Sequence, residues 1–200
     1  MPKETFFRLP EEKRRRIYQA AVEEFAAYRF SDASINRMVK AAGIPRGSFY
    51  QYFKNKEDLY LYVMGEIGKE KLKVLSRYGP ADDQAGFFET AKSALPAVFD
   101  WAESHPLYNR IGFLMALDDS DFIRMVMKKI NDSQPFLRQM LKKDQAKGLI
   151  RPEIDTDLVA DMYLNLALGL CRDYYGGTPR EEIIGKVGSL LEIICHGILA

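Results

Sequence analysis

Hydrophobic residues recur at helical spacing along most of the chain, and the recurrence is clearest between residues 35 and 42. There the apolar positions fall at i, i+3, i+4 and i+7, which places them on one face of a helix. Ser34 stands at the helix start, where its hydroxyl can accept from the first free backbone N–H groups. Gly43 stands where a left-handed residue commonly ends a helix. The apolar face consists of Ile35, Met38, Val39 and Ala42.

A second short helix follows this turn. Pro45 suits its start, because the φ angle of proline is already helical and proline has no N–H group to leave unpaired. Phe49 and Phe53, four residues apart, should point to the core, and Ile44 should fill the corner between the two helices. The outward surface holds one cation, hydroxyls and an amide but no carboxylate. Its residues are Arg46, Ser48, Gln51 and Tyr52, with Tyr50 at the edge.

A third helix begins directly afterwards. Asn55 can cap its first turn, and Glu57 and Asp58 suit the positive end of the helix dipole. Lys56 does not suit it, because a cation in a first turn is disfavoured by about 0.3–1 kcal/mol. A bound anion would reverse the sign, and the free N–H groups of a helix start suit phosphate. Lys56 would therefore be favourable here with a phosphate bound at this helix start.

Two helices joined by a glycine-containing turn form a helix-turn-helix, whose second helix enters the major groove of DNA. A general helical corner would show the same periodicity, so the detail of the motif carries more weight than the period. Residues 34–59 closely resemble the N-terminal signature of the TetR family of bacterial transcriptional regulators, through the run AGI-x-x-G-S-x-Y-x-YF-x-x-KE-x-L. Two positions differ: Val39 stands where the family usually has Ala, and Pro45 replaces the common Ser or Thr cap.

The resemblance implies an all-α fold with a three-helix head, a long connecting helix and a second α-helical domain. We expect residues 1–55 to form the helix-turn-helix DNA-binding head. Residues 56–200 would form the effector-binding and dimerisation domain. The expected function is that of a ligand-responsive regulator that binds a pseudo-palindromic operator as a homodimer, and a repressor, because the family is mostly repressive.

The same resemblance assigns DNA contacts residue by residue. Arg46 faces the groove and can pair with guanine, and Gln51 can pair with adenine. Gly47 lets the backbone come close to DNA. Tyr50 and Tyr52 are placed for phosphates, although either could instead be a half-buried packing residue. The full predicted DNA-binding set is Asn36, Arg37, Pro45, Arg46, Gly47, Ser48, Tyr50, Gln51, Tyr52 and Lys56.

The composition supports this reading without deciding it. The chain has 200 residues, of which 47% are hydrophobic and 28% charged, as in a globular protein. The net charge is only +1, but residues 1–60 hold 12 Lys and Arg against 8 Asp and Glu. The basic excess therefore lies on the predicted head, as expected for a phosphate-binding module. Within it, the run 13–16 (KRRR) is either a solvated helix face or a contact to phosphates flanking the groove.

Further helices follow from the same period. Gly65 and Gly68 inside the long helix indicate close packing or a bend, and Pro96 should kink or split the helix that contains it. The acidic group 118–121 is read as the cap of a helix start in preference to a cation site. Residues 1–9 are predicted to form a loosely ordered arm, followed by a helix that begins at Pro10 and has the core residues Ile17, Ala21, Phe25 and Tyr28. The long helix should run from Lys56 to about Tyr78, where Gly79-Pro80 ends it. Later helices are predicted over 85–104, over 107–117, over 122–148 with a break at Pro135, from a cap at Asp155 or Thr156, and over 180–199.

The last two helices carry more apolar surface than one small domain can cover. Between Met162 and Cys171 only Asn165 is strongly polar, so that helix must be covered on all sides. We expect a homodimer through a four-helix bundle, with a large monomeric core as the alternative. The resemblance points to the dimer. The predicted interface residues are Leu166, Leu170, Val187, Leu191 and Ile194.

Aromatic and methionine residues are abundant in the second half of the chain. Such stripes are often plain core, but the resemblance implies a small-molecule effector inside this domain, and the set indicates an apolar or aromatic one. A regulator of the same fold that is governed by a protein partner or by DNA spacing is the alternative. The predicted pocket residues are Trp101, Tyr108, Phe113, Phe122, Met125, Phe136, Met140, Tyr163 and Asn165.

Other functional classes find little support. His105 and His196 are the two histidines and belong to no ligand cluster, and neither a Gly-rich phosphate loop nor a nucleophile elbow is present, so we expect no enzyme, no metal and no cofactor. Cys171 and Cys195 are read as small buried residues, with a redox sensor as the alternative. Neither a signal peptide nor a membrane span is recognisable. The expected partners are double-stranded DNA, a second copy of the chain and a small molecule, in the cytoplasm and without a membrane.

Overall fold

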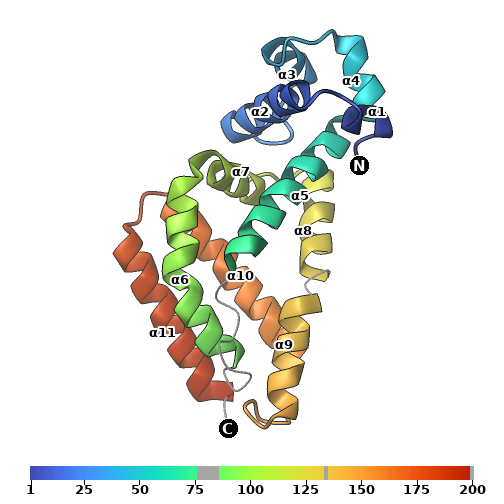
Figure 1. Cartoon of the computed structure of the whole chain (residues 1–200). Helices are drawn as coiled ribbons and strands as arrows, with labels where there is room; N and C mark the ends of the chain where they lie inside the picture. The colour runs from blue at the N-terminus through green and yellow to red at the C-terminus, as the bar shows by residue number, and fades with distance from the viewer. Residues whose placement is uncertain (76–85, 133–134, 199–200) are drawn as a thin grey trace. The chain divides into compact units, whose positions relative to one another are not determined.

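The computed structural model describes residues 1–75, 86–132 and 135–198, and every regular element within them is an α-helix (Figure 1). The all-α prediction is confirmed. The helices are α1 (Glu4–Phe7), α2 (Glu11–Ala27), α3 (Ile35–Ala41), α4 (Arg46–Tyr52), α5 (Lys56–Leu75), α6 (Phe87–Ser104), α7 (Pro106–Ala116), α8 (Asp121–Asp132), α9 (Pro135–Ala146), α10 (Thr156–Tyr175) and α11 (Arg180–Ile198).

By contacts the chain forms two compact units. The first unit contains residues 1–72 and 102–124, and the second contains residues 73–101 and 125–200. In the first, α2 packs against α3 and α7, and α1 packs against α4. Helix α7 and the first turn of α8 therefore belong to the same unit as the helix-turn-helix. In the second, α10 packs against both α9 and α11.

The core of the first unit follows the predicted apolar stripes, with one exception. Ile17, Ala21 and Phe25 of α2 are buried, as expected. Tyr28 is 43% exposed, because α2 ends at Ala27 and Tyr28 already has an extended backbone. The prediction of Tyr28 as a core residue is wrong.

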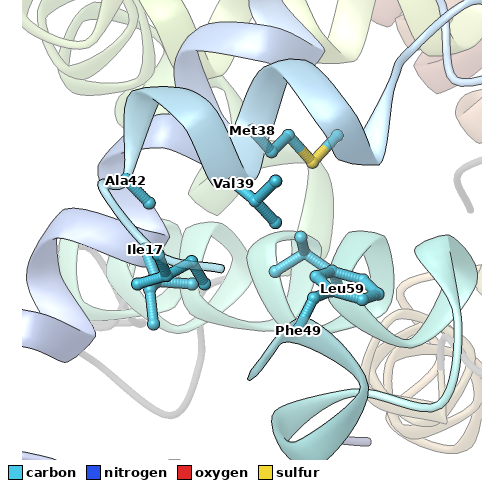
Figure 2. Close-up of a pocket in the computed structure, with 7 residues that line it drawn as sticks. Ile17, Met38, Val39, Ala42, Phe49 and Leu59 are labelled. Atoms are coloured by element: carbon cyan, nitrogen blue, oxygen red, sulfur yellow. The ribbon is translucent and has the colours of Figure 1, made fainter. Parts of the chain in front are cut away.

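Helices α2, α3, α4 and α5 meet around a small apolar void. Its volume is about 10 Å³, so it is at most the size of one water molecule and has no polar lining to hold one (Figure 2). The centre of the head is therefore close-packed and offers no room for an effector. The lining residues are Ile17, Met38, Val39, Ala42, Ile44, Phe49 and Leu59.

Helix α5 starts as the sequence indicates. The Asn55 side chain caps it, accepting a hydrogen bond of 3.0 Å from the backbone N–H of Asp58. The predicted end at Gly79-Pro80 lies outside the described residues. A Cβ atom built at Gly65 or Gly68 would meet no atom within 4 Å, so close packing within the chain does not explain these glycines.

The second unit has its core between α6, α9, α10 and α11. Phe88, Leu141, Ile150, Ala160 and Leu191 are buried there. Pro96 lies inside α6 without splitting it. Helix α9 begins at Pro135, the residue predicted to interrupt the helical pattern. The predicted cap at Asp155 is confirmed by hydrogen bonds from the N–H groups of Asp157 and Leu158.

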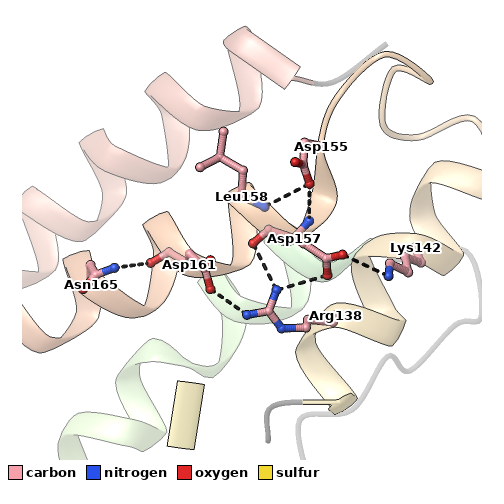
Figure 3. Close-up of polar contacts among 7 residues, drawn as sticks. All are labelled: Arg138, Lys142, Asp155, Asp157, Leu158, Asp161 and Asn165. Atoms are coloured by element: carbon pink, nitrogen blue, oxygen red, sulfur yellow. Dashed lines mark hydrogen bonds and ion pairs between the residues drawn. The ribbon is translucent and has the colours of Figure 1, made fainter. Parts of the chain in front are cut away.

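An ion-pair network joins α9 to the first turns of α10 (Figure 3). The guanidinium of Arg138 contacts the carboxylates of Asp157 at 3.1 Å and Asp161 at 2.6 Å, and Lys142 contacts Asp157 at 3.2 Å. Hydrogen bonding to Arg138 lowers the pKa of Asp157. Because the carboxylates are about half-exposed, the network orients the two helices more than it stabilises them.

Candidate nucleic-acid interface

The helix-turn-helix forms where the sequence places it. Gly43 has a φ of +64°, the left-handed value expected at the end of α3, and Ile44 is buried in the corner before α4. Ser34 occupies the N-cap position of α3, but its side chain makes no capping hydrogen bond. Its backbone N–H instead donates to Oε1 of Glu24 at 2.7 Å, so a carboxylate from α2 holds the start of α3.

The outer face of α4 is open. Arg46, Gly47 and Gln51 are exposed, and Ser48 is half-buried. Tyr50 is 43% exposed and therefore accessible, while Phe49 and Phe53 on the opposite side are buried. The helix contains no acidic residue. This face can therefore donate hydrogen bonds to a polyanion without charge repulsion from its own side chains.

Tyr52 does not belong to this open face. Its side chain is only 6% exposed and packs beside the ring of Phe6, with the ammonium of Lys13 5.7 Å from the Tyr52 ring centre. The prediction that Tyr52 points away from the core is wrong, and the packing alternative holds. The reason is that residues 1–9, predicted to be loosely ordered, contain α1 and cover this side of α4.

Arg37 is tied into the protein. Its Nε donates to both carboxylate oxygens of Glu24 at 2.9 and 3.0 Å, and its Nη2 donates to Glu24 Oε1 at 2.5 Å and to the carbonyl of Asp32 at 2.9 Å. The guanidinium lies 4.0 Å from the ring centre of Tyr28. Hydrogen bonding to Glu24 raises the pKa of Arg37. Arg37 thus fixes α3 to α2, whereas its neighbour Asn36 is exposed.

Lys56 is also used internally. Its ammonium donates to the carbonyls of Phe30 at 2.6 Å, Ser31 at 3.2 Å and Ala33 at 2.9 Å. Three protons thus meet three acceptors, and burial lowers the pKa of Lys56. These carbonyls offset the unfavourable position of a cation at the start of α5, so no bound phosphate is needed to explain it. We therefore no longer expect Lys56 to contact DNA.

Basic residues of α2 lie next to the motif. Arg15 and Arg16 are exposed and, with Gln19, Glu23 and Ala41, line an open groove of about 430 Å³ beside the end of α3. This position is compatible with either interpretation of the basic run. Its contact to flanking phosphates stays a prediction.

The comparisons with known proteins agree with this geometry. Residues 17–63, from α2 into α5, match the family model of bacterial regulatory proteins of the tetR family. The transcriptional regulator YdgC of Bacillus subtilis, of the helix-turn-helix type, is 27% identical over 94% of this chain and 93% of its own length. A solved TetR-family regulator from Chloroflexus aurantiacus is 26% identical, with a TM-score of 0.64 over 100% of this chain and 99% of that one.

The chain carries the DNA-binding segment of the TetR family of bacterial regulatory proteins, and its relatives over nearly the full length are transcriptional regulators. The regulator therefore has a helix-turn-helix head and an α-helical second part. Its relatives are named as transcriptional regulators, and the family is not enzymatic. The prediction that the protein is not an enzyme is therefore confirmed. The fold is also that of FadR from Bacillus subtilis, solved in complex with stearoyl-CoA, at 20% identity and a TM-score of 0.70 over 92% of this chain and 98% of that one.

The residues predicted for an effector pocket of the regulator are divided between the two units. Tyr108, Phe113 and Phe122 belong to the first unit, where the Phe122 ring packs 4.3 Å from that of Phe30. Trp101, Met125, Met140, Tyr163 and Asn165 belong to the second unit. Met125 is 55% exposed and Asn165 is exposed. The side chain of Phe136 lies outside the described residues.

The residues predicted for the dimer interface fall into two groups, those that pack in the core of their own chain and those that are half-buried. Leu191 is 5% exposed and lies in the core of its own chain, against which Val187 and Ile194 also pack. Its assignment to an interface is wrong, because the stripe of α11 is broad enough to face the core with one edge and leave the other free. Leu166 and Leu170 are half-buried. The side chains of Cys171 and Cys195 lie outside the described residues.

Two absences apply to the described part of the chain. Its side chains contain no group of three or more His, Cys, Asp or Glu residues placed to hold a metal ion. None of its helices is long and apolar enough to span a membrane.

Proposed function

We propose that this regulator is a repressor that binds a pseudo-palindromic operator as a homodimer and is released by a small apolar or aromatic effector. The observation that carries the DNA part is the outer face of α4. Arg46, Ser48 and Gln51 supply donors and acceptors suited to base edges, and Tyr50 is accessible for a phosphate. Residues 1–55 would be the DNA-binding part, residues 56–200 the effector and dimerisation part, and the cytoplasm the place of action.

The dimer is supported by apolar surface left open on the last two helices. Leu158 and Met162 of α10 are 57% and 49% exposed, and Ile193 of α11 is 69% exposed. Among the described residues, a Cβ atom built at Gly185 or Gly188 would meet nothing within 4 Å, so close packing there does not explain these glycines. Exposed Leu, Met and Ile beside glycines suit a close helix–helix contact with a second copy.

A dimer would also bind DNA more tightly than a single head can. One recognition helix covers little DNA, and a two-fold pair doubles the contacts, with half-sites about one helical turn or a multiple apart. The modest basic excess of residues 1–60 fits this arrangement, because neither copy alone would hold DNA tightly.

The effector is the least constrained part of the proposal. The FadR structure shows that this fold can hold a ligand with a long apolar chain. The abundance of aromatic residues and methionines in this chain supports an effector of apolar or aromatic character. A coupling of about 1–3 kcal/mol between effector and operator, or about 5- to 150-fold in affinity, would suffice for release.

The experiment for this part measures the affinity of the purified regulator for DNA from upstream of its own gene. The titration is repeated with stearoyl-CoA and with a panel of apolar and aromatic compounds. We expect at least one compound to weaken operator binding about 5-fold or more while leaving binding to unrelated DNA unchanged. If the operator is bound but no compound changes its affinity, the alternative stands, a regulator governed by a protein partner or by DNA spacing.

A further inference from the structure

The last four carbonyl groups of the recognition helix α4 all have donors, and most of the donors come from the start of the chain. A helix leaves its last four carbonyls without partners inside the helix. The carbonyl of Phe49 accepts from the backbone N–H of Phe53 at 2.9 Å. The carbonyl of Tyr50 accepts from the ammonium of Lys3 at 2.7 Å, that of Gln51 from the hydroxyl of Thr5, and that of Tyr52 from the backbone N–H of Lys3 at 2.8 Å.

The donors are held in place by an apolar anchor. Phe6, in α1, is fully buried, and its ring centre lies 5.0 Å from that of Phe53, 5.3 Å from that of Tyr62 and 6.3 Å from that of Tyr52. These partners come from the end of α4, the residue after it and α5. Figure 1 shows α1 beside α4, in agreement with their packing. The anchor fixes the register between the start of the chain and the end of α4.

The charge of this contact is favourable as well. The C-terminal end of a helix carries partial negative charge, and a cation there is stabilising. Lys3 provides that cation from a segment 47 residues away in sequence. Helix α4 has seven residues, too few to be stable without external contacts. Its end, and with it the orientation of its outer face, therefore depends on residues 3–6.

We propose that residues 3–6, the capping arm, position the recognition helix for operator readout, with Lys3 and Thr5 as positioning residues that act through α4. The proposal deepens the proposed function and rests on it. It differs from a basic arm that binds DNA directly, because the ammonium of Lys3 is directed at the carbonyl of Tyr50.

The test compares four full-length variants with the wild type. Lys3→Met and Thr5→Val, made together, remove both side-chain donors and keep the Phe6 anchor. Lys3→Arg with Thr5→Ser retains a cation and a hydroxyl and should restore function. Arg8→Met is the matched charge control, because Arg8 is exposed and its guanidinium pairs with Glu4 of its own helix turn. Thr5→Val alone is nearly isosteric and guards against a double variant that fails to fold.

Two readouts separate positioning from direct contact. The first is hydrogen exchange of the α4 amides without DNA, which should quicken in the double variant and, to a lesser extent, in Thr5→Val. The second is affinity for the operator and for unrelated DNA over a salt series. Loss of two capping hydrogen bonds should weaken operator binding by about 5- to 150-fold, with an unchanged salt slope and little change on unrelated DNA.

Each other outcome overturns the proposal. Unchanged α4 exchange in Thr5→Val and the double variant would show that the capping arm does not hold the helix end. A salt slope reduced by about one, with equal losses for the Lys3→Met, Thr5→Val double variant and for Arg8→Met, would mean direct phosphate contact. If the wild type binds the operator no more tightly than unrelated DNA, the proposed function is wrong. Hydrogen exchange of the α4 amides still tests whether the capping arm holds the end of α4.

Discussion

Arg37 in α3 is bound side-on by the carboxylate of Glu24 in α2, with Nη2 2.5 Å from Oε1 and Nε 2.9 Å from the same oxygen. Glu24 is almost fully buried and also accepts from the backbone N–H of Ser34, whereas the Arg37 side chain is half-exposed. One carboxylate therefore holds both the start of α3 and the side chain that the family motif assigns to DNA. The position of α3 on α2 depends on this pair.

The Glu24–Arg37 pair predicts that a change in α2 alters DNA binding without touching the DNA. Glu24→Gln leaves an acceptor for Ser34 but removes the charge that binds Arg37. We expect a lower melting temperature of the head and weaker operator binding. A double-mutant cycle with Arg37→Met should show coupling between the two sites. Glu23→Gln, at the exposed neighbour of Glu24 in α2, is the control. Additive effects of Glu24→Gln and Arg37→Met would contradict the account.

A substitution of Lys56 should change the free energy of unfolding but not the salt dependence of operator binding. Lys56→Met removes the donor to three carbonyls between α2 and α3, which should lower the free energy of unfolding by about 1–3 kcal/mol. Because the ammonium donates to these three carbonyls of the chain, the salt slope of operator binding should not change. Chemical unfolding and a salt titration measure the two quantities, with the exposed Lys54→Met as control. A slope smaller by about one would restore Lys56 as a phosphate contact.

Asp118 gives a prediction for acid pH. The carboxylate accepts from the backbone N–H of Ser31 at 2.8 Å and of Ser120 at 2.9 Å. Burial alone would raise the pKa of Asp118, but its hydrogen bonds with Ser120 and Ser31 outweigh burial and lower it. Since the folded pKa lies below that of an unfolded Asp, about 3.9, the stabilisation is present above that pH. It is lost as the pH falls through the folded pKa.

The measurement is the melting temperature between about pH 6 and pH 2.5. The wild type should lose more stability over this range than Asp118→Asn, which carries no charge to lose. Asp119→Asn changes an exposed neighbour and serves as control. Equal pH profiles for wild type and Asp118→Asn would show that this link between α2–α3 and the start of α8 does not stabilise the fold.

The open face of α10 and α11 gives a prediction for assembly. Ile193→Asp and Met162→Asp should yield helical monomers, because both side chains are exposed in one chain and would meet a partner. Leu191→Ala should instead lower the free energy of unfolding by about 2–5 kcal/mol, because Leu191 is buried in its own core. Sedimentation and chemical unfolding distinguish the two classes. The same change at exposed Leu72 is the control, and a dimer that survives Ile193→Asp and Met162→Asp would refute this interface.

Local rules predicted the helix-turn-helix well. The turn at Gly43 needs a left-handed residue, the cap at Asn55 needs an acceptor three residues before an N–H, and the buried pair Phe49 and Phe53 follows from helical spacing. Each of these features depends on residues within one or two helical turns. These features can be predicted from the sequence because they do not depend on contacts with distant segments.

The errors share the opposite property. Periodicity places Tyr52 on the outward face of its helix but does not reveal that Phe6 covers it. It also does not reveal that carbonyls of the α2–α3 connection accept from the ammonium of Lys56. Leu191 was assigned to a partner because an apolar stripe does not reveal which edge meets its own core. These outcomes depend on contacts between distant segments, which composition and spacing do not contain.

The most direct measurement is a footprint of the regulator on DNA from upstream of its own gene, with wild type, Arg46→Ala and Gln51→Ala compared over a salt series. The account predicts a protected pseudo-palindrome with half-sites about one helical turn or a multiple apart. Each variant should weaken it by about 5- to 150-fold and relax the base preference at one position per half-site. Protection without a defined sequence, equal in all three proteins, would contradict base readout by α4.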